Sequence, residues 1–132
     1  EYVLADAFDW EPPSDAQFDM IFFGFFMSHV PPEAFAGLWA RVRSWLVASG
    51  RVFVVDDAAG PDRPYSGDVV ADGPRYAHRR SLSDGREYTI VKVFYEPGEL
   101  EARLGELGWN AEIRGSGEHF LYGSARPFPS GQ

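Results

Sequence analysis

The 132-residue sequence contains no cysteine and only three histidines. The lack of cysteine excludes disulfide bonds, cysteine nucleophiles and metal sites built on thiolates. It also fits a reducing compartment, so we expect a cytoplasmic protein. Long hydrophobic stretches are missing as well, because the longest apolar run, Met20–Met27, is far short of the roughly 20 residues that span a bilayer.

Basic residues are scarce relative to acidic ones. The sequence has 12 Lys and Arg against 20 Asp and Glu, which gives a net charge of −8 and a pI of about 4.7. Such a charge repels phosphate backbones and anionic lipid headgroups, so we expect neither nucleic acid nor a membrane as a partner. Apolar residues make up 45% of the chain and aromatic residues 16%, which is typical of a packed domain.

Signatures of several enzyme and metal-site classes are absent. No serine lies in a G-x-S-x-G frame, which argues against a serine hydrolase. The Gly115–Gly117 segment precedes a predicted strand rather than a helix, so it indicates a turn and not a phosphate-binding loop. A group of aspartates lacks the spacing of a calcium loop and predicts a solvated acidic loop without metal. These aspartates are Asp56, Asp57, Asp62, Asp68 and Asp72.

Hydrophobic periodicity predicts a strand–helix–strand unit in the first half of the chain. Phe18–Met27 is almost continuously apolar, which predicts a strand buried on both faces. Apolar residues within 35–46 recur with helical spacing, and Gly50 stands where a left-handed helix cap belongs. Arg51–Asp56 is predicted as the next strand, parallel to the first. Tyr2–Ala7 is predicted as a short strand before this unit.

The second half of the chain predicts antiparallel pairs around one helix. Ser83-Asp84-Gly85 lies between two strand-like runs and predicts a hairpin. Glu96–Glu99 predicts the start of a helix that Gly108 ends. The strands predicted for the two antiparallel pairs are Tyr76–Leu82 with Arg86–Phe94, and Asn110–Arg114 with His119–Ser124.

Ligands of open α/β sheets bind at the carboxyl ends of the parallel strands. Here those ends are Asp6–Trp10, Phe23–His29 and Asp56–Asp57. The Asp6 carboxylate can accept a hydrogen bond from an adenine amino group, and aromatic side chains such as Phe8 can wall the ring. A plain loop position is an equal alternative for Asp6. For Phe22, and for Phe25 or Phe26, a position in the core is favoured.

Four segments carry a resemblance to a known family: ADAFDW (Ala5–Trp10), FDMIFFGFFMSHVP (Phe18–Pro31), FAGLWARVRSWLVASGRVFVVDD (Phe35–Asp57) and VKVFYEPGELEARLGELGW (Val91–Trp109). They resemble class I S-adenosylmethionine-dependent methyltransferases that act on small molecules. They follow one another in the family's order and span nearly the whole chain. The resemblance implies an α/β fold with a Rossmann-like methyltransferase sheet, mostly parallel and ending in an antiparallel hairpin.

The family's glycine-rich E/D-x-G-x-G-x-G loop has no counterpart in this sequence. We therefore expect residues 1–132 to form a partial class I methyltransferase domain that lacks the N-terminal elements, with 76–94 as an inserted hairpin. In the family's strand order, the two strands that join the predicted strands Tyr2–Ala7 and Phe18–Met27 would be missing. Phe18–Met27 would then have a free edge, and free edges recruit other chains, so we expect self-association.

The resemblance implies S-adenosylmethionine as the cofactor and assigns residues to it. Asp6 matches the acid that contacts the adenine amino group, with Ala7 and Phe8 beside the ring. Phe23 and Gly24 match the strand end whose backbone faces the methionine part.

His29 lies just beyond that strand end, next to the expected cofactor and the methyl-transfer region. It is the candidate catalytic base, with a purely structural histidine as the alternative. The resemblance also implies that Tyr76–Val91 lines the acceptor pocket, with Arg80 and Lys92 as candidate polar contacts. An apolar or aromatic acceptor would suit a pocket lined by Trp10, Phe26, Tyr76 and Tyr95, residues that could equally belong to the core.

The function predicted from these features is methyl transfer from S-adenosylmethionine to a small-molecule acceptor, as part of a longer chain. The alternative is a non-catalytic methyltransferase-like module that packs with a partner, or a fragment that cannot bind the cofactor. Binding of S-adenosylmethionine by the chain distinguishes the two.

Overall fold

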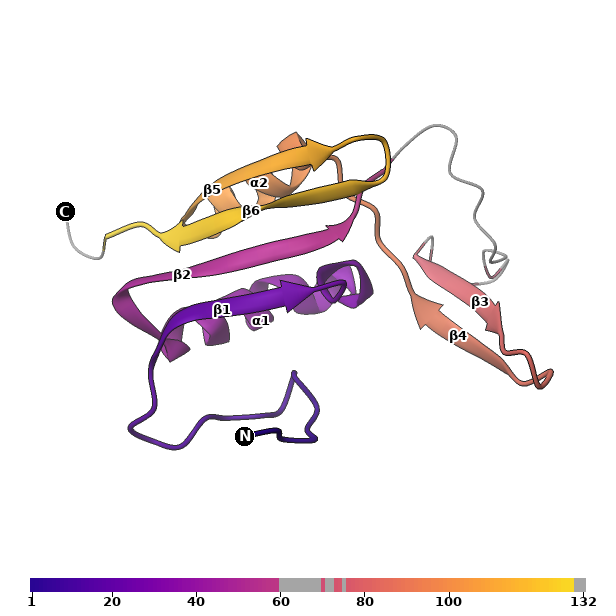
Figure 1. Cartoon of the computed structure of the whole chain (residues 1–132), viewed down its shortest axis with the longest axis horizontal. Coiled ribbons are helices and arrows are strands. Elements are labelled where there is room, and N and C mark those ends of the chain that lie inside the picture. Colours follow the sequence, from indigo (N-terminus) through magenta and orange to yellow (C-terminus); the bar gives the residue numbers. More distant parts are fainter. Residues whose placement is uncertain (60–69, 71–72, 75, 130–132) are drawn as a thin grey trace.

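The computed structural model describes residues 1–59, 70, 73–74 and 76–129. Within these residues a four-stranded sheet and two α-helices form the body, and a two-stranded hairpin projects from one end (Figure 1). In chain order the elements are β1 (Phe18–Gly24), the 3-10 helix η1 (Met27–His29), α1 (Pro32–Trp45), β2 (Leu46–Asp57), β3 (Ala77–Ser81), β4 (Glu87–Val91), α2 (Pro97–Glu106), β5 (Trp109–Ser116) and β6 (Phe120–Pro127).

The sheet of the body is mixed rather than mostly parallel. In the described part of the chain its order is β1-β2-β6-β5, and only the β1–β2 pair is parallel. The expected predominance of parallel strands is therefore not met here, because the antiparallel β5–β6 pair joins directly onto β2. The predicted strand–helix–strand unit and both predicted antiparallel pairs are confirmed.

Helix α1 begins at a pair of prolines. Pro31 is the N-cap residue, and Pro32 occupies the first helical turn, where its missing N–H removes no hydrogen bond. Glu33 lies in the same turn and complements the positive end of the helix dipole. The buried face of the helix is the one that the periodicity predicts, with Phe35, Leu38, Trp39, Val42 and Trp45.

The predicted cap at Gly50 is wrong. Helix α1 ends at Trp45 and β2 follows at once, so Gly50 lies inside a strand. A Cβ atom at Gly50 would lie 2.9 Å from the carbonyl oxygen of Val47. The register between β1 and β2 also shifts between Phe18 and Met20. The glycine therefore permits a close backbone approach in an irregular strand instead of ending the helix.

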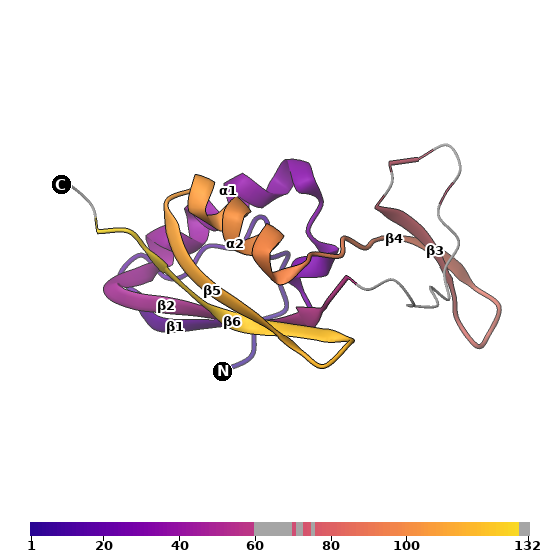
Figure 2. The ribbon, with the colours of Figure 1, turned by 90° about the horizontal axis from the view of Figure 1, so that it is seen from above.

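Strand β1 is shorter and less buried than predicted. It ends at Gly24, and the side chains of Met20 and Phe22 are 55% and 58% exposed. The prediction of a strand buried on both faces as far as Met27 is therefore wrong. Figure 2 shows the reason, because α1 and α2 both lie on one face of the sheet. No described element covers the opposite face.

The predicted strand Tyr2–Ala7 is not formed. Residues 1–17 are irregular, and the side chains of Tyr2 and Leu4 are fully exposed. Strand β1 pairs with β2 on one side and, among the described residues, has no strand partner on the other (Figure 1). The predicted free edge of β1 is thus present. The backbone N–H and C=O groups of a strand must bond to a neighbouring strand. Tyr2–Ala7 has no neighbouring strand in the described structure, which explains why it stays irregular.

The hydrophobic core lies between the sheet and the two helices. Trp39 of α1 and Trp109 of β5 meet edge to face, with ring centroids 4.8 Å apart. Val52 and Val54 of β2 point to the same side and are fully buried. In the described part of the chain, neither helix has the length and apolar character needed to cross a membrane.

Candidate functional site

The first candidate region forms where β1 and β2 reach their carboxyl ends. Phe25 has a positive φ of 55°, which is uncommon for a bulky residue. Its N–H donates to the Val55 carbonyl oxygen at 2.8 Å. After this turn the chain enters η1, which carries Ser28 and His29. The structure therefore brings η1 to the edge of the sheet at which α/β proteins bind their ligands.

Asp56 is buried at the end of β2 and holds η1 in place. Its Oδ2 accepts the Ser28 N–H at 2.8 Å, and its Oδ1 accepts the Asp57 N–H at 2.7 Å. Only 2% of Asp56 is exposed, so the prediction of a solvated acidic loop is wrong for this residue. The carboxylate is tolerated there because it satisfies two backbone donors. The remaining members of the predicted loop, Asp62, Asp68 and Asp72, lie outside the described residues.

Lys92 completes a buried polar cluster at the same edge. Its Nζ donates to Ser28 Oγ at 2.9 Å and to Asp57 Oδ2 at 2.7 Å, and it lies 4.0 Å from Asp56 Oδ1. The lysine side chain is 7% exposed. Two carboxylates facing one ammonium leave a local charge of −1. Removing one partner of such a pair typically costs about 3–5 kcal/mol, because the other charge is left buried.

His29 is tied to the end of the hairpin by its ring. Its Nδ1 lies 2.7 Å from the carbonyl oxygen of Val91. A carbonyl oxygen only accepts, so Nδ1 carries the proton, and Nε2 of the neutral ring keeps its lone pair. The backbone of the same segment adds a bond, because the Val93 N–H donates to Ser28 O at 2.7 Å. His29 itself is exposed, so Nε2 is available to accept a proton.

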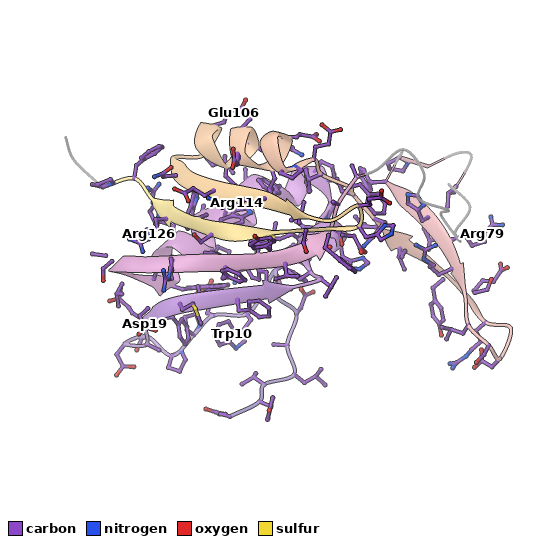
Figure 3. All side chains as sticks on the ribbon, turned by 45° about the horizontal axis from the view of Figure 1, so that its top comes forward. Trp10, Asp19, Arg79, Glu106, Arg114 and Arg126 are labelled. Atoms are coloured by element: carbon purple, nitrogen blue, oxygen red, sulfur yellow. The ribbon has the colours of Figure 1, made fainter. Side chains whose placement is uncertain are left out.

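The hairpin carries two of the residues predicted to contact the acceptor. The Tyr76 hydroxyl donates to the Glu33 carboxylate, whose two oxygens both lie at 2.8 Å. This hydrogen bond raises the pKa of Tyr76. Arg80 is half-buried in β3, opposite Tyr88 of β4. Its exposed neighbour Arg79 lies apart from the body of the molecule (Figure 3).

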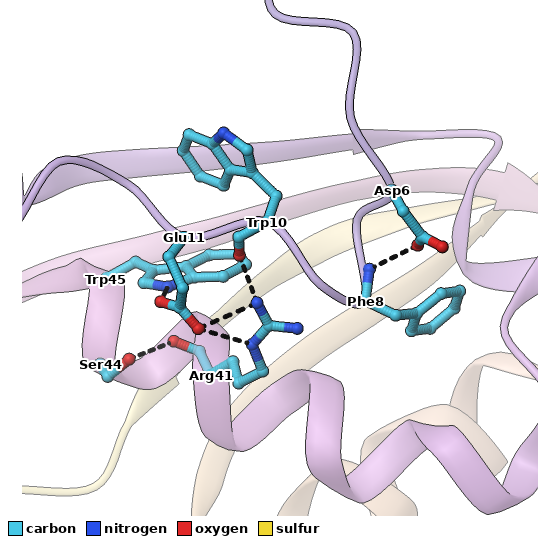
Figure 4. Close-up of polar contacts among 7 residues, drawn as sticks. All are labelled: Asp6, Phe8, Trp10, Glu11, Arg41, Ser44 and Trp45. Carbon is cyan, nitrogen blue, oxygen red and sulfur yellow. Dashed lines mark hydrogen bonds and ion pairs between the residues drawn. The ribbon is translucent and has the colours of Figure 1, made fainter.

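The second candidate region is a turn that begins at Asp6 (Figure 4). Asp6 Oδ1 accepts the Phe8 N–H at 2.9 Å. The Asp6 carbonyl oxygen accepts the N–H groups of Asp9 at 3.1 Å and Trp10 at 2.8 Å. One carboxylate oxygen is thus engaged within the turn. Asp6 is otherwise exposed, so its second oxygen can accept from a ligand.

Aromatic contacts join the two candidate regions. The ring of Phe8 lies 6.3 Å from that of Phe26, and Phe26 lies 5.5 Å from Phe23 at the end of β1. Phe23 in turn meets Trp39 of the core edge to face. The structure therefore brings together Phe8, Phe23 and Phe26, three of the predicted site residues. Ala7 and Gly24 are their chain neighbours.

Two predicted acceptor contacts lie elsewhere. Trp10 meets Trp45 edge to face at 5.5 Å and lines a cavity of about 890 Å³ between residues 1–18 and the end of α1. Tyr95 is 3% exposed and packs against Phe35 in the core. Burial raises the pKa of its phenol, although Arg103 opposes the shift. For Tyr95 the core alternative left open by the sequence therefore describes the structure.

The sequence favoured the core for Phe22 and for Phe25 or Phe26. Of the last two, Phe26 is half-buried and packs against the core, which meets that prediction. Phe22 is 58% exposed, so for Phe22 the prediction is wrong, and Phe25 is 49% exposed. Both lie on the side of the sheet that no described element covers. No group of three or more His, Asp and Glu in the described residues is placed to hold a metal ion.

Sequence reasoning missed the partners that order these regions. No local pattern in the sequence assigns a role to Ser28 or pairs Lys92 with Asp56. Ser28 and Lys92 are 64 residues apart, so no local pattern could have revealed the contact. The aspartates that end β2 were the available signal, because consecutive acids after an apolar strand need a buried partner or solvent.

Comparison with known proteins places this geometry in context. No protein-family model matches the sequence, and no curated protein does. Among solved structures, the DhpI–SAH complex is 38% identical with a TM-score of 0.79, and it aligns with 98% of this chain. The DhpI–SAM–HEP complex is 39% identical with a TM-score of 0.81, over 96% of this chain. These alignments cover 55% and 57% of the DhpI chains, so this chain spans little more than half their length.

A more distant structure shares the fold alone. The 1,6-didemethyltoxoflavin-N1-methyltransferase of Burkholderia thailandensis, bound to 1,6-didemethyltoxoflavin and S-adenosylhomocysteine, is 21% identical with a TM-score of 0.58. It aligns with 96% of this chain and 50% of its own.

Proposed function

Because the chain belongs to the class I S-adenosylmethionine-dependent methyltransferases, we propose that it takes part in methyl transfer to a small-molecule acceptor. The observation that carries this proposal is the similarity of the chain to DhpI in sequence and structure. Two DhpI complexes, one named for SAH and one for SAM, are 38% and 39% identical over almost the whole of this chain. S-adenosylmethionine is accordingly the cofactor that we propose.

The residues of the two candidate regions fit this cofactor. Asp6 offers an exposed carboxylate oxygen to the adenine amino group, and Phe8 stands next to it with Phe26 behind its ring. Ala7 lies within the same turn. Gly24 is exposed at the end of β1, where its backbone is proposed to face the methionine part, and the ring of Phe22 lies where a Cβ atom of residue 24 would be. Phe23 packs beneath the same strand end.

When bound, the cofactor supplies a methyl group made electrophilic by its sulfonium. The contribution of the protein is then to position the acceptor and to remove its proton where one must leave. His29 Nε2 is the base that we propose. The Val91 carbonyl fixes the tautomer, and the buried cluster of Asp56, Ser28 and Lys92 fixes η1 on which the ring stands.

The acceptor side of the site is proposed to lie between η1 and the hairpin. Phe26 supplies an apolar wall, and Tyr76 and Arg80 supply polar groups. Lys92 is largely engaged by Ser28 and Asp57, so its contact with an acceptor requires an exchange of partners. Trp10 remains a proposed contact only if the acceptor extends toward the cavity beside β1.

The chain is further proposed to act within a longer protein. The solved structures that it matches are nearly twice as long, and the sequence holds no E/D-x-G-x-G-x-G loop. The uncovered face and free edge of the sheet are consistent with additional elements. The same observations favour the second candidate function, a methyltransferase-like module that does not bind the cofactor. The two differ in a measurable property, namely affinity for S-adenosylhomocysteine.

The decisive experiment is calorimetry with S-adenosylhomocysteine, followed by a methyl-transfer assay over a range of pH. Micromolar binding of S-adenosylhomocysteine together with methyl transfer supports the enzyme. The absence of both in the protein at its native length supports the module that does not bind the cofactor. We expect His29→Ala to lower kcat by about 10²–10⁴-fold if the acceptor must lose a proton. Unchanged turnover at every pH would remove His29 from the mechanism. His119→Ala, a change in the β5–β6 turn, serves as the control.

A further inference from the structure

Residues 1–17 contact the body of the chain through aromatic rings, Phe8 against Phe26 and Trp10 against Trp45, and through hydrogen bonds to side chains on α1. In the described structure, every hydrogen bond that joins this segment to the rest involves Arg41 or Trp45 (Figure 4). The other hydrogen bonds of the segment are internal to it. The polar anchoring of residues 1–17 therefore depends on very few side chains.

Arg41 makes most of these contacts. Its Nε and Nη2 donate to Glu11 Oε1 at 3.2 and 3.0 Å, and Nη2 also donates to the carbonyl oxygen of Trp10. The guanidinium carbon lies 5.4 Å from the ring centroid of Trp45. Trp45 Nε1 donates to the second Glu11 oxygen at 3.3 Å. The planar guanidinium thus holds a carboxylate, a carbonyl and an aromatic face at once, which an ammonium group cannot do.

The carbonyl held by Arg41 belongs to the residue that closes the Asp6 turn. The Trp10 N–H donates to the Asp6 carbonyl oxygen at 2.8 Å, and its C=O accepts from Arg41. One residue, Trp10, therefore connects the guanidinium to the turn. If that anchor is lost, the turn keeps its internal bonds but loses its fixed orientation relative to Phe26 and β1.

We propose that Arg41 is a positioning residue that sets the Asp6–Trp10 turn for cofactor binding without touching the cofactor. This inference rests on the proposed function, which assigns Asp6, Ala7 and Phe8 to the adenine side. The loss of Arg41 should therefore weaken cofactor binding and leave the transfer step itself nearly unchanged.

Arg43 provides a matched control on the same helix. Its Nη2 donates to the carbonyl oxygens of Gly108 at 3.2 Å and Phe128 at 3.1 Å, and its guanidinium carbon lies 5.8 Å from the ring centroid of Trp109. Like Arg41 it binds a backbone carbonyl and lies against a tryptophan, but its second hydrogen-bond acceptor is another carbonyl instead of a carboxylate, and its partners are on the C-terminal side of the molecule. A general effect of losing an arginine from α1 would appear in both variants.

The test compares Arg41→Gln, Arg41→Lys and Arg43→Gln in the protein at its native length. Hydrogen exchange of residues 6–12 should become about tenfold faster in Arg41→Gln and stay unchanged in Arg43→Gln. The Kd for S-adenosylhomocysteine should rise about tenfold in Arg41→Gln, with kcat at saturating cofactor within about twofold of the parent. Arg41→Lys should recover only part of the affinity. Glu11→Gln, a milder change to the same contact, should give a smaller shift in the same direction, and it carries the test if Arg41→Gln does not fold.

Other outcomes would overturn either the proposed function or the role of Arg41 alone. A parent protein that does not bind S-adenosylhomocysteine overturns both the proposed function and this inference. A parent that binds, with Arg41→Gln binding equally well, overturns the inference alone. Equal losses in Arg41→Gln and Arg43→Gln, or a fall in kcat at saturation with an unchanged Kd, also overturn it.

Discussion

The two faces of the sheet differ sharply although the same strands make both. On the face covered by α1 and α2, Val52, Val54 and Leu121 are at most 1% exposed. On the other face, Phe22 and Met20 of β1 are more than half exposed, and Tyr122 of β6 is 39% exposed. Side chains alternate between the faces along each strand, so neighbouring residues have opposite surroundings.

This difference shows that the strands carry more apolar surface than the described fold buries. Phe22 stacks on Phe53 with ring centroids 6.0 Å apart, and Phe25 meets Phe120 edge to face. A cavity of about 330 Å³ lies among the aromatic residues of this face. Arg114, which pairs with Tyr122 across the β5–β6 ladder, and Arg126 are exposed on these strands (Figure 3). A contiguous aromatic patch of this kind is typical of a surface that another structure covers.

The largest expected effect is on stability, and it is tested by replacing one aromatic residue on each face of the sheet. Trp39→Ala should lower the free energy of unfolding by about 3–5 kcal/mol, because the indole is fully buried against Trp109, Phe23 and Phe35. Phe22→Ala should cost less than about 1 kcal/mol, since most of that ring is already exposed. Denaturant unfolding at low protein concentration measures both. Equal losses would mean that the second face is covered in solution.

The sequence predicted where helices and strands form better than it predicted which of their faces are buried and which strands pair. The periodicity within 35–46 predicts α1 because a helix that packs on one layer shows its buried stripe directly. An apolar run such as Phe18–Met27 predicts burial on both faces, but burial depends on what lies opposite each face. The irregular course of Tyr2–Ala7 has the same cause, because a strand exists only through its neighbour.

In the candidate site, too, some features could be predicted from the sequence and others could not. The positions of Asp6 and His29 at the sheet edge could be predicted, because the ends of parallel strands are set by topology. The cluster of Asp56 with Lys92 and the anchoring of Glu11 by Arg41 could not. Each depends on a contact between residues about 30 or more positions apart, and no local spacing encodes such a contact.

A second prediction concerns what covers the aromatic face in the isolated chain. We expect the purified 132-residue chain to self-associate through this face and the free edge of β1, with a second copy as the partner. Phe22→Lys should weaken the association by about tenfold or more, because burying one phenylalanine is worth about 1.5–3 kcal/mol. Light scattering across a dilution series gives the association constant.

The matched control for this experiment is Leu82→Lys on the hairpin. Leu82 is 46% exposed, so the substitution adds the same charge at an exposed apolar side chain away from the sheet. It should leave the association constant unchanged. A parent chain that stays monodisperse and monomeric at high concentration would contradict the prediction, and so would equal effects of the two substitutions.

The smallest expected effect concerns tyrosine titration on the covered side. Burial raises the pKa of Tyr95 above its ordinary value of 10.0, and an exposed hydrogen bond to Glu33 does the same for Tyr76. A raised pKa means that, near and above pH 10, the folded state holds a proton that the unfolded state releases. The stabilising contribution is therefore complete below pH 10 and is lost as pH rises through the folded-state pKa.

We expect Tyr95→Phe to flatten the fall in stability between pH 9 and 11, measured by urea unfolding. Tyr76→Phe should flatten it less, because solvent screens an exposed hydrogen bond. If Tyr76→Phe had the larger effect, the covered side would not be the one that controls alkaline stability.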